Sequence, residues 1–394
     1  MSGRVLVRGL RTMRRVWVMG IASALLGACG QESGAPGDAG ATRDGSLLQA
    51  RDASSQDGSF HDGPLHDGSL YDAGHDAELP RPSSCIGTWT GERCVLLLAS
   101  GQSSPASIAV DDTDVYWLNA GTEPVRYIDG TVMKTSKNGG EIVTLATGQA
   151  FPGSIALDET SVYWSVYDPT NVAALVKMPK AGGTPTTIVS GQLDVAGVVV
   201  SAGSAYFTDN GVMKVPVDGG APATLTGTDY NLHGLAANDA GVFFTDELVG
   251  AVLRVGLDGG ATTTLASDAG LLSDIAVDAV HAYWLTVVGD AGAIVRAPLL
   301  GGRGRGPSVT LATTSGSPFA LAVGTEGIYW QNGGAPTGVA LMKVPKDGGP
   351  VTTLATGLAQ SWPLGWVSGV GLTAADDTSV YAISGDEVLK VTPN

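Results

Sequence analysis

Residues that could bind a metal or act as nucleophiles are sparse in this chain of 394 residues. Three cysteines stand at positions 29, 85 and 94, and five histidines at 61, 66, 75, 233 and 281. Their spacings include neither a CxxC pair nor HExxH, so zinc and iron–sulfur sites are not expected. The chain also lacks a GxSxG elbow or a phosphate-binding loop in a credible context. We therefore assign no cofactor, no metal site and no catalytic residue.

The cysteine at position 29 follows a segment with the organisation of an export signal. Residues 1–15 are basic, and residues 16–28 (VWVMGIASALLGA) are apolar apart from one serine, too short for a good membrane-spanning helix. The segment ends in LGAC, which resembles the lipobox of bacterial lipoproteins. This resemblance implies that residues 1–28 are a signal peptide and that Cys29 becomes the acylated first residue. Because Gly30 rather than Asp follows, it implies a lipid anchor in the outer membrane, on its periplasmic or surface side. The alternative is an ordinary signal peptide with a chance cysteine.

Residues 29–84 have the composition of a tether. From residue 51 to 75 they repeat every five residues, with Asp at 52, 57, 62, 67 and 72. The segment has few large apolar side chains, so it cannot bury enough surface to offset chain entropy. We expect an acidic, disordered linker. A weak metal site formed by its Asp and His is the alternative, but this spacing does not converge ligands on one ion as an EF-hand loop does.

The overall charge argues against one class of partner. The formal net charge is −16, and the first 28 residues carry five Arg and no acid, so the rest of the chain is still more acidic. A surface of this charge repels phosphate backbones, so we expect no nucleic-acid partner. Solubility is the simpler interpretation of the acidic charge.

Cys85 and Cys94 bracket the sequence IGTWTGER. Export would place both thiols in an oxidising compartment, and the eight intervening residues readily form a hairpin-like loop. We expect a disulfide between them, which would fix the start of the folded domain. We place this domain at residues 85–394.

From Val95 onward the chain consists of repeated units. A three-residue aromatic motif recurs at intervals of 37 to 52 residues. It occurs at 115–117, 162–164, 205–207, 242–244, 282–284, 328–330 and 380–382. An apolar stretch precedes each motif, and a basic strand ending in a Gly-Gly turn and a VTLA-like stretch follows it in six units. Each unit therefore predicts four short antiparallel strands.

Four strands in a unit of this length are typical of a β-propeller blade. We predict an all-β propeller of seven four-stranded blades, with six or eight as alternatives. The last unit, from about Gly369, supplies three strands, and residues 95–99 (VLLLA) supply the fourth. This pairing closes the ring and leaves no exposed edge.

Two units, AYFTDNGVMKVPVDGG (205–220) and VFFTDELVGAVLRVGLDGG (242–260), resemble the YWTD repeats of low-density-lipoprotein-receptor-type propellers. The resemblance implies the architecture, although that family normally has six blades. We interpret Asp209 and Asp246, which follow the aromatic strand, as turn caps or blade-to-blade hydrogen-bond acceptors. The recurring Tyr and Trp are interpreted as packing between blades.

Loops that join consecutive blades should run inward and form a rim around the central channel. Three glutamines, Gln102, Gln149 and Gln192, lie in these loops. The candidate ligand residues of this rim are Phe151, Tyr230, His233, Asp274, Phe319, Trp362 and Trp366. Aromatic loops at a channel mouth suit a ligand or peptide. Trp362 and Trp366 equally suit a role in covering the closure between blades.

Two classes of function remain. The first is a non-catalytic, monomeric binding or scaffold lipoprotein that contacts an envelope protein, peptide or glycan at the rim. The second is a propeller-type lyase or hydrolase acting on a polysaccharide or lactone. The apolar first strands leave few acid–base groups for the channel, which favours binding over catalysis.

Overall fold

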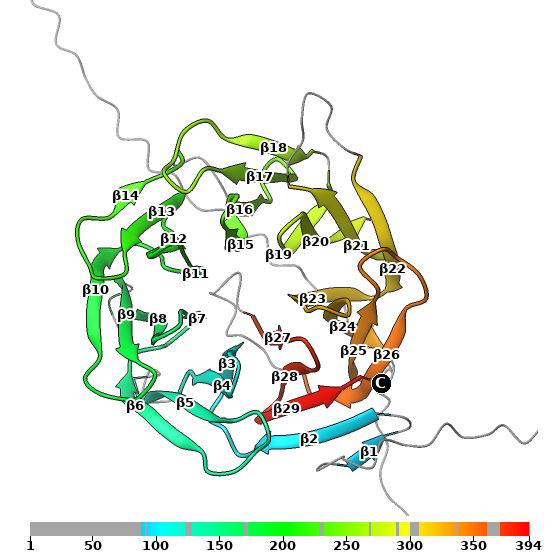
Figure 1. Cartoon of the computed structure of the whole chain (residues 1–394), viewed down its shortest axis with the longest axis horizontal. Helices are drawn as coiled ribbons and strands as arrows, with labels where there is room; N and C mark the ends of the chain where they lie inside the picture. The colour runs from blue at the N-terminus through cyan, green and yellow to red at the C-terminus, as the bar shows by residue number, and fades with distance from the viewer. Residues whose placement is uncertain are drawn as a thin grey trace, which may run out of the picture. The chain divides into compact units, whose positions relative to one another are not determined.

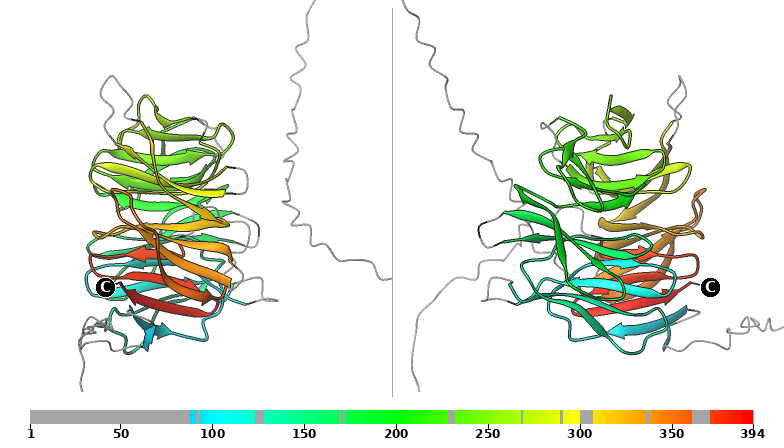
Figure 2. Two further views of the ribbon diagram at one scale, coloured as in Figure 1. Left: turned by 90° about the vertical axis from the view of Figure 1, so that its right-hand side faces the viewer. Right: turned by 60° about the vertical axis from the view of Figure 1, so that its left-hand side comes forward.

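The computed structural model describes residues 88–90, 93–122, 128–168, 170, 172–227, 232–267, 269–288, 291–299, 307–335, 338–360 and 371–393. These residues form strands and loops without a helix, so none of them provides an apolar helix long enough to cross a bilayer. The strands make seven antiparallel sheets arranged as a ring, which confirms the predicted seven-bladed propeller (Figure 1). Viewed edge-on, the blades lie side by side in one thick ring (Figure 2).

Six blades are continuous in sequence and contain four strands each. Blade 1 comprises β3 (Pro105–Val110), β4 (Asp114–Asn119), β5 (Gly130–Ser136) and β6 (Val143–Gln149). Blade 2 comprises β7 (Ile155–Leu157), β8 (Ser161–Tyr167), β9 (Ala173–Pro179) and β10 (Thr186–Gln192). Blade 3 comprises β11 (Val198–Ser201), β12 (Ser204–Thr208), β13 (Val212–Pro216) and β14 (Ala223–Thr224).

The other three continuous blades have the same strand order. Blade 4 comprises β15 (Leu232–Asn238), β16 (Gly241–Asp246), β17 (Ala251–Val255) and β18 (Thr263–Ala266). Blade 5 comprises β19 (Leu271–Val277), β20 (His281–Val288), β21 (Ala291–Pro298) and β22 (Val309–Ser315). Blade 6 comprises β23 (Ser317–Val323), β24 (Ile328–Ala335), β25 (Gly338–Val344) and β26 (Thr352–Leu358). In each blade the first strand lies nearest the centre of the ring (Figure 1).

Blade 7 joins the two ends of the propeller, as predicted. Its strands β27 (Thr373–Ala375), β28 (Val380–Ser384) and β29 (Glu387–Thr392) are completed by β2 (Arg93–Ala99). β2 pairs antiparallel with β29, with Val95 opposite Val391 and Leu97 opposite Leu389. The sequence did not predict β1 (Thr88–Thr90), which pairs with β2 as a fifth strand. Cys94 lies in β2, whereas Cys29 and Cys85 lie outside the described residues, so the lipidation, the disulfide and the domain boundaries at 28 and 84 stay predictions.

The second strand of each blade builds the core between blades. Tyr116 of blade 1 packs in one cluster with Trp164 of blade 2, and Tyr283 of blade 5 packs with Trp330 of blade 6. Blades 7 and 1 meet in the same way through Tyr381. These side chains are at most 1% exposed, which confirms that the recurring aromatic residues pack between blades.

The turns between third and fourth strands depend on glycine. In blade 3 the N–H of Gly219 donates to the carbonyl of Pro216 at 2.9 Å. Gly219 and Gly220 have φ of 88° and 139°, a region in which a side chain is strained. Because the same turn recurs, it presents equivalent residues of different blades in equivalent places.

Candidate functional site

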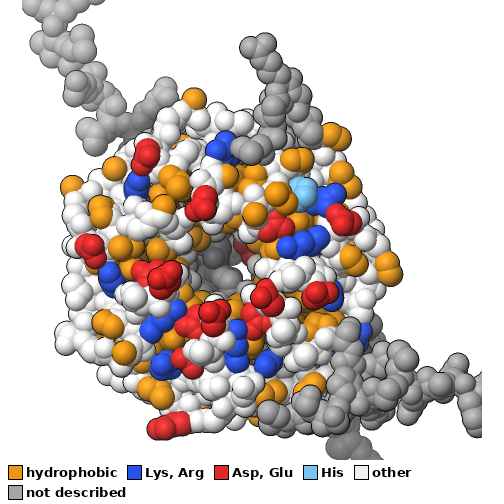
Figure 3. Space-filling view, in the orientation of Figure 1, with side chains coloured by type: hydrophobic (Ala, Val, Ile, Leu, Met, Phe, Trp, Pro, Cys, Tyr) orange, Lys and Arg blue, Asp and Glu red, His pale blue; other side chains and the backbone are white. Residues whose placement is uncertain are grey.

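The loops of the ring divide between two faces, because successive strands of a blade run in opposite directions. On one face lie the loops that join first to second and third to fourth strands, such as 111–113 and 137–142 in blade 1. We name it the ion-pair face, and Figure 3 shows its Lys, Arg, Asp and Glu side chains gathered around the centre of the ring. The second-to-third loops and the connections between blades lie on the opposite face, which we name the connection face.

The predicted rim residues come from the blade connections and the starts of first strands. Tyr230, Trp362 and Trp366 lie outside the described residues, whereas Phe151, His233, Asp274 and Phe319 are described. The role of the rim in ligand binding therefore stays a prediction. The four described residues make the following contacts.

The two phenylalanines have packing partners. Phe151 meets Tyr167 edge-on, with ring centroids 6.1 Å apart and an interplanar angle of 81°. The Tyr167 hydroxyl in turn donates to Asp194 at 2.7 Å. Phe319 packs against the cores on both sides of blade 7. Both rings therefore contribute to holding the blades and their connections together.

Asp274 links two blades through its carboxylate. It accepts the backbone N–H of its neighbour Ile275 and that of Leu321 in blade 6, each at 2.8 Å. Burial raises the pKa of Asp274 to about 6, although both backbone donors act to lower it. A carboxyl with this pKa changes its protonation close to neutral pH.

A histidine and a carboxylate, His233 and Glu247, lie in contact on the connection face. The His233 Nε2 atom lies 2.8 Å from Glu247 Oε2, and the two side chains are 30% and 29% exposed. Such a pair can exchange a proton with a ligand. Within the described part of the chain, no three His, Cys, Asp or Glu side chains come close enough together to hold a metal ion.

The glutamines of the blade connections have a structural role that the sequence did not reveal. Gln102 Oε1 accepts the indole N–H of Trp117 at 2.9 Å, and Gln149 Oε1 accepts that of Trp164 at the same distance. All three glutamines also donate to the carbonyl two residues before them, Ser190 in the case of Gln192. Gln192 makes no indole contact, because the equivalent aromatic residue of the next blade, Phe207, has no ring N–H. A glutamine at the third position after the VTLA-like stretch, followed by Trp in the next unit, is the signal that could have identified this contact.

The ion-pair face carries a recurring aspartate turn. It begins with Asp111, Asp158, Asp278 or Asp376, five residues before the tyrosine of the second strand. One carboxylate oxygen accepts the backbone N–H groups two and three residues ahead, for example Thr378 and Ser379 at 2.7 and 2.8 Å in blade 7. The other oxygen accepts the tyrosine hydroxyl, at 2.9 Å for Tyr381 and Asp376. These four aspartates are therefore turn caps. Asp246 has a similar role, because it accepts the N–H of Leu248 at 3.0 Å.

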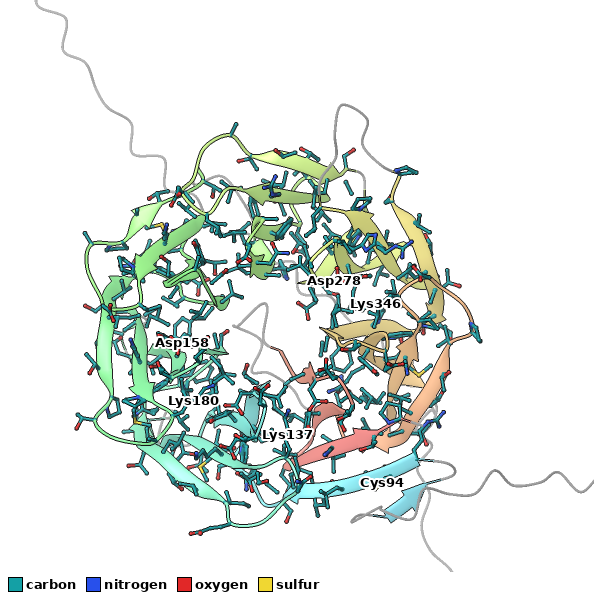
Figure 4. All side chains as sticks on the ribbon, in the orientation of Figure 1. Cys94, Lys137, Asp158, Lys180, Asp278 and Lys346 are labelled. Atoms are coloured by element: carbon teal, nitrogen blue, oxygen red, sulfur yellow. The ribbon has the colours of Figure 1, made fainter. Side chains whose placement is uncertain are left out.

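Three of these aspartates bind a lysine from the following blade. Lys180 lies 2.8 Å from Asp111, and Lys137 lies 2.8 Å from Asp376. Lys346 lies 3.0 Å from Asp278, and both are labelled in Figure 4. All six side chains are less than one-third exposed. Burial alone would raise the pKa of Asp376, but Lys137, two backbone N–H groups and the Tyr381 hydroxyl lower it to about 2. These carboxylates are therefore ionised at neutral pH.

Asp158 differs from the other three. In the next blade, Val217 stands after the strand-ending Pro216, where Lys180 follows Pro179 and Lys346 follows Pro345. No lysine can therefore reach Asp158 from that position. Hydrogen bonds from the Tyr163 hydroxyl and the backbone of its own turn still lower the Asp158 pKa, against the effect of burial.

A groove opens on the ion-pair face where blade 7 meets blade 1. Its volume is about 720 Å³, and most of its lining is polar. The lining residues are Val110, Asp111, Asp112, Thr113, Ser136, Lys137, Asn138, Ala375, Asp376, Asp377, Thr378 and Lys390. The sequence did not predict this site, because its residues come from both ends of the propeller.

Comparisons with known proteins show the fold. No family model and no curated protein matches the chain. Among solved structures, U3-55K superposes with a TM-score of 0.55 at 13% identity, over 76% of this chain and 98% of that one. The computationally designed Ika8 protein gives 0.52 at 13% identity, over the same shares. A puromycin-hydrolyzing peptidase of Mycobacterium tuberculosis gives 0.53 at 16% identity, over 73% of this chain and 51% of that one. At these identities the likeness extends to the propeller architecture alone.

Proposed function

We propose that this chain is a binding protein of the cell envelope, whose propeller holds a ligand without transforming it. The observation that carries the proposal is the polar groove between blades 7 and 1. Two of its carboxylates, Asp111 and Asp376, are already bound by lysine, tyrosine and backbone N–H groups. Because their pKa values lie far below neutrality, they are poor general acids and bases but good hydrogen-bond acceptors.

A ligand screen tests this function. The purified protein is applied to arrays of envelope glycans and peptides, and each bound compound is recovered and analysed by mass spectrometry. We expect a compound that binds, returns unchanged, and is lost when Asn138→Trp fills the groove. Ala181→Trp, at the equivalent turn position of blade 2 and outside the groove lining, is the matched control. Failure to bind any compound, or binding that survives Asn138→Trp, would contradict the proposal.

The His233–Glu247 pair supports a second function, that of a lyase or hydrolase acting on a polysaccharide or lactone. Its two side chains are close enough to share a proton and are partly open to solvent. In the same screen, an enzyme would return a cleaved compound. Cleavage lost in His233→Gln but retained in His281→Gln would favour this second function.

The anchor is the remaining part of the proposal. The LGAC sequence supports acylation at Cys29, and Gly30 in the next position supports attachment to the outer membrane. Cells grown with a labelled fatty acid should incorporate the label into the protein but not into the Cys29→Ser variant. Cys94→Ser is the control, and it should retain the label. Equal labelling of the Cys29→Ser variant would contradict the anchor.

A further inference from the structure

Three junctions between blades share a second kind of ion pair. A cation in the third strand, opposite the aromatic residue of the second strand, reaches an aspartate in the third-to-fourth turn of the next blade. The pairs are Lys177–Asp218 at 3.4 Å, Lys214–Asp258 at 2.8 Å and Arg296–Asp347 at 2.8 Å. The register is the same in each case, with Lys177 opposite Tyr163, Lys214 opposite Tyr206 and Arg296 opposite Tyr283. At these junctions the fold itself places a carboxylate against the cation.

The junction of blades 7 and 1 has the cation without the carboxylate. Lys390 stands opposite Tyr381, and its Nζ atom lies 6.0 Å from the centre of the tyrosine ring. The turn of blade 1 has the same hydrogen bond, from the Gly139 N–H to the Ser136 carbonyl at 2.8 Å. Its aspartate position, however, is occupied by Asn138. Lys390 forms no ion pair with any described residue. Burial lowers its pKa, although the charge of the Asp376 carboxylate acts to raise it.

The groove therefore contains a half-buried cation beside an open space. Both Lys390 and Asn138 line it. Its volume of about 720 Å³ lies within the range of small-molecule sites. A carboxylate entering this space would give Lys390 the partner that Asp218, Asp258 and Asp347 provide elsewhere.

The rest of the lining indicates what else the ligand carries. The hydroxyl and amide groups of Thr113, Ser136 and Asn138 can bond to other hydroxyls. The exposed carboxylates of Asp112 and Asp377 accept hydrogen bonds from donors and repel further negative charge. A ligand with one carboxylate and several hydroxyl donors fits this surface better than a polyanion.

We propose that this groove binds an acidic sugar, whose carboxylate contacts Lys390 in the place that an aspartate takes at three other junctions. The inference depends on the proposed binding function and names its ligand class. A peptide is the less suitable occupant, because peptides are commonly anchored by apolar or aromatic side chains in apolar pockets. Val110 and Ala375 are the apolar residues of this lining.

NMR titration of the whole purified protein tests the proposal. The probes are glucuronic and galacturonic acid, the neutral sugars glucose and galactose, and the acidic peptide acetyl-Gly-Glu-Gly amide. At least one acidic sugar should bind. Its neutral counterpart should bind at least about tenfold more weakly, because it lacks the charge-assisted contact. Tighter binding of the neutral sugar, binding of the peptide alone, or no binding of either acid would overturn the inference.

Two pairs of variants locate the site. Lys390→Met should weaken the binding of the acidic sugar by about tenfold. Lys343→Met, which removes a cation in the same register of blade 6, 5.8 Å from the Tyr329 ring centre, should leave binding unchanged. Asn138→Asp should weaken the binding of the acidic sugar by supplying the missing carboxylate. Ala181→Asp, which adds the same charge at the turn of blade 2, should leave binding unchanged.

These outcomes separate the inference from the function beneath it. If both variants of a pair lose the acidic sugar, or if both keep it, the proposed site at Lys390 is wrong. The thermal unfolding midpoint of each variant shows that it is folded. A compound found on the arrays that depends on the groove but not on Lys390 would leave the binding function standing and overturn the acidic-sugar inference.

Discussion

The second strands of the blades are alike from blade to blade, whereas the turns on the ion-pair face differ. The second strands are nearly alike, with a fully buried aromatic residue from each blade in the core between neighbours. The turns vary from junction to junction, with two kinds of ion pair between blades 5 and 6 and one between blades 7 and 1. The shared positions therefore build the ring, and departures from the repeat create its individual surfaces.

The largest expected effect lies in the shared part, at the strand that closes the ring. Leu98 in β2 is 5% exposed, whereas its neighbour Leu97 is 49% exposed. Leu98→Asp should lower the free energy of unfolding by more than about 3 kcal/mol, because it buries a carboxylate in the core between blades 7 and 1. Leu97→Asp should change it by about 0.5 kcal/mol or less. Denaturant unfolding measures both, and equal effects would show that closure by β2 does not stabilise the ring.

A smaller loss of stability is expected when the buried Trp117 loses the hydrogen-bond acceptor that Gln102 provides. Gln102→Met removes the acceptor of the Trp117 indole N–H and of the Asn119 amide, which lie 2.9 and 3.0 Å away. The indole N–H would be left without an acceptor and the Asn119 amide would keep its bond to Thr131, so the change should cost about 1 to 3 kcal/mol in the free energy of unfolding. Gln192→Met, which removes only a bond to the Ser190 carbonyl, should cost less than half as much. A similar loss in both variants would remove the distinction between the two glutamines.

The ion pairs should have the smallest effect on stability and a clear pH dependence. Lys346→Met leaves the partly buried Asp278 without its cation and should cost about 1 kcal/mol at pH 7. Lys177→Met, whose partner Asp218 is 92% exposed, should cost less.

The pH dependence follows from the pKa of Asp278. Burial would raise it, but the backbone N–H groups of Val280 and His281, Lys346 and Tyr283 lower it from 3.8 to about 2. The stabilisation should therefore be complete above pH 4 and disappear as the pH falls through about 2. Urea unfolding of the wild type and Lys346→Met at several pH values measures this loss. A difference that stayed constant down to pH 2 would contradict the ion-pair interpretation.

The sequence predicted the features that each unit encodes within itself. Aromatic strands, glycine turns and aspartate caps depend on residues a few positions apart, so they can be recognised in one repeat. The closing strand at residues 95–99 was predictable because it matches the fourth strand that the last unit lacks. Its outer neighbour β1 belongs to no repeat and was not predicted.

The site could not be predicted in the same way. The groove brings residues 110–113 and 136–138 against residues 375–378 and Lys390. Which lysine meets which aspartate depends on contacts between different blades, such as Lys214 and Asp258, 44 positions apart. A rim of aromatic loops was the natural expectation from composition. Phe151, Phe319 and Gln102 show how side chains in or near such loops can instead serve packing and hydrogen bonding.

The central claim is that Lys390, at the junction of blades 7 and 1, lacks the turn carboxylate that the equivalent cations bind at three other junctions. NMR titration of the lysine side chains tests it most directly, with Lys390 assigned by comparison with Lys390→Met. The pKa of Lys390 should lie below the ordinary value of 10.5, because burial disfavours its charged form. It should rise in Asn138→Asp and in the presence of a bound acidic sugar, but not in Ala181→Asp. A pKa of Lys390 that is unmoved by either carboxylate would contradict the account.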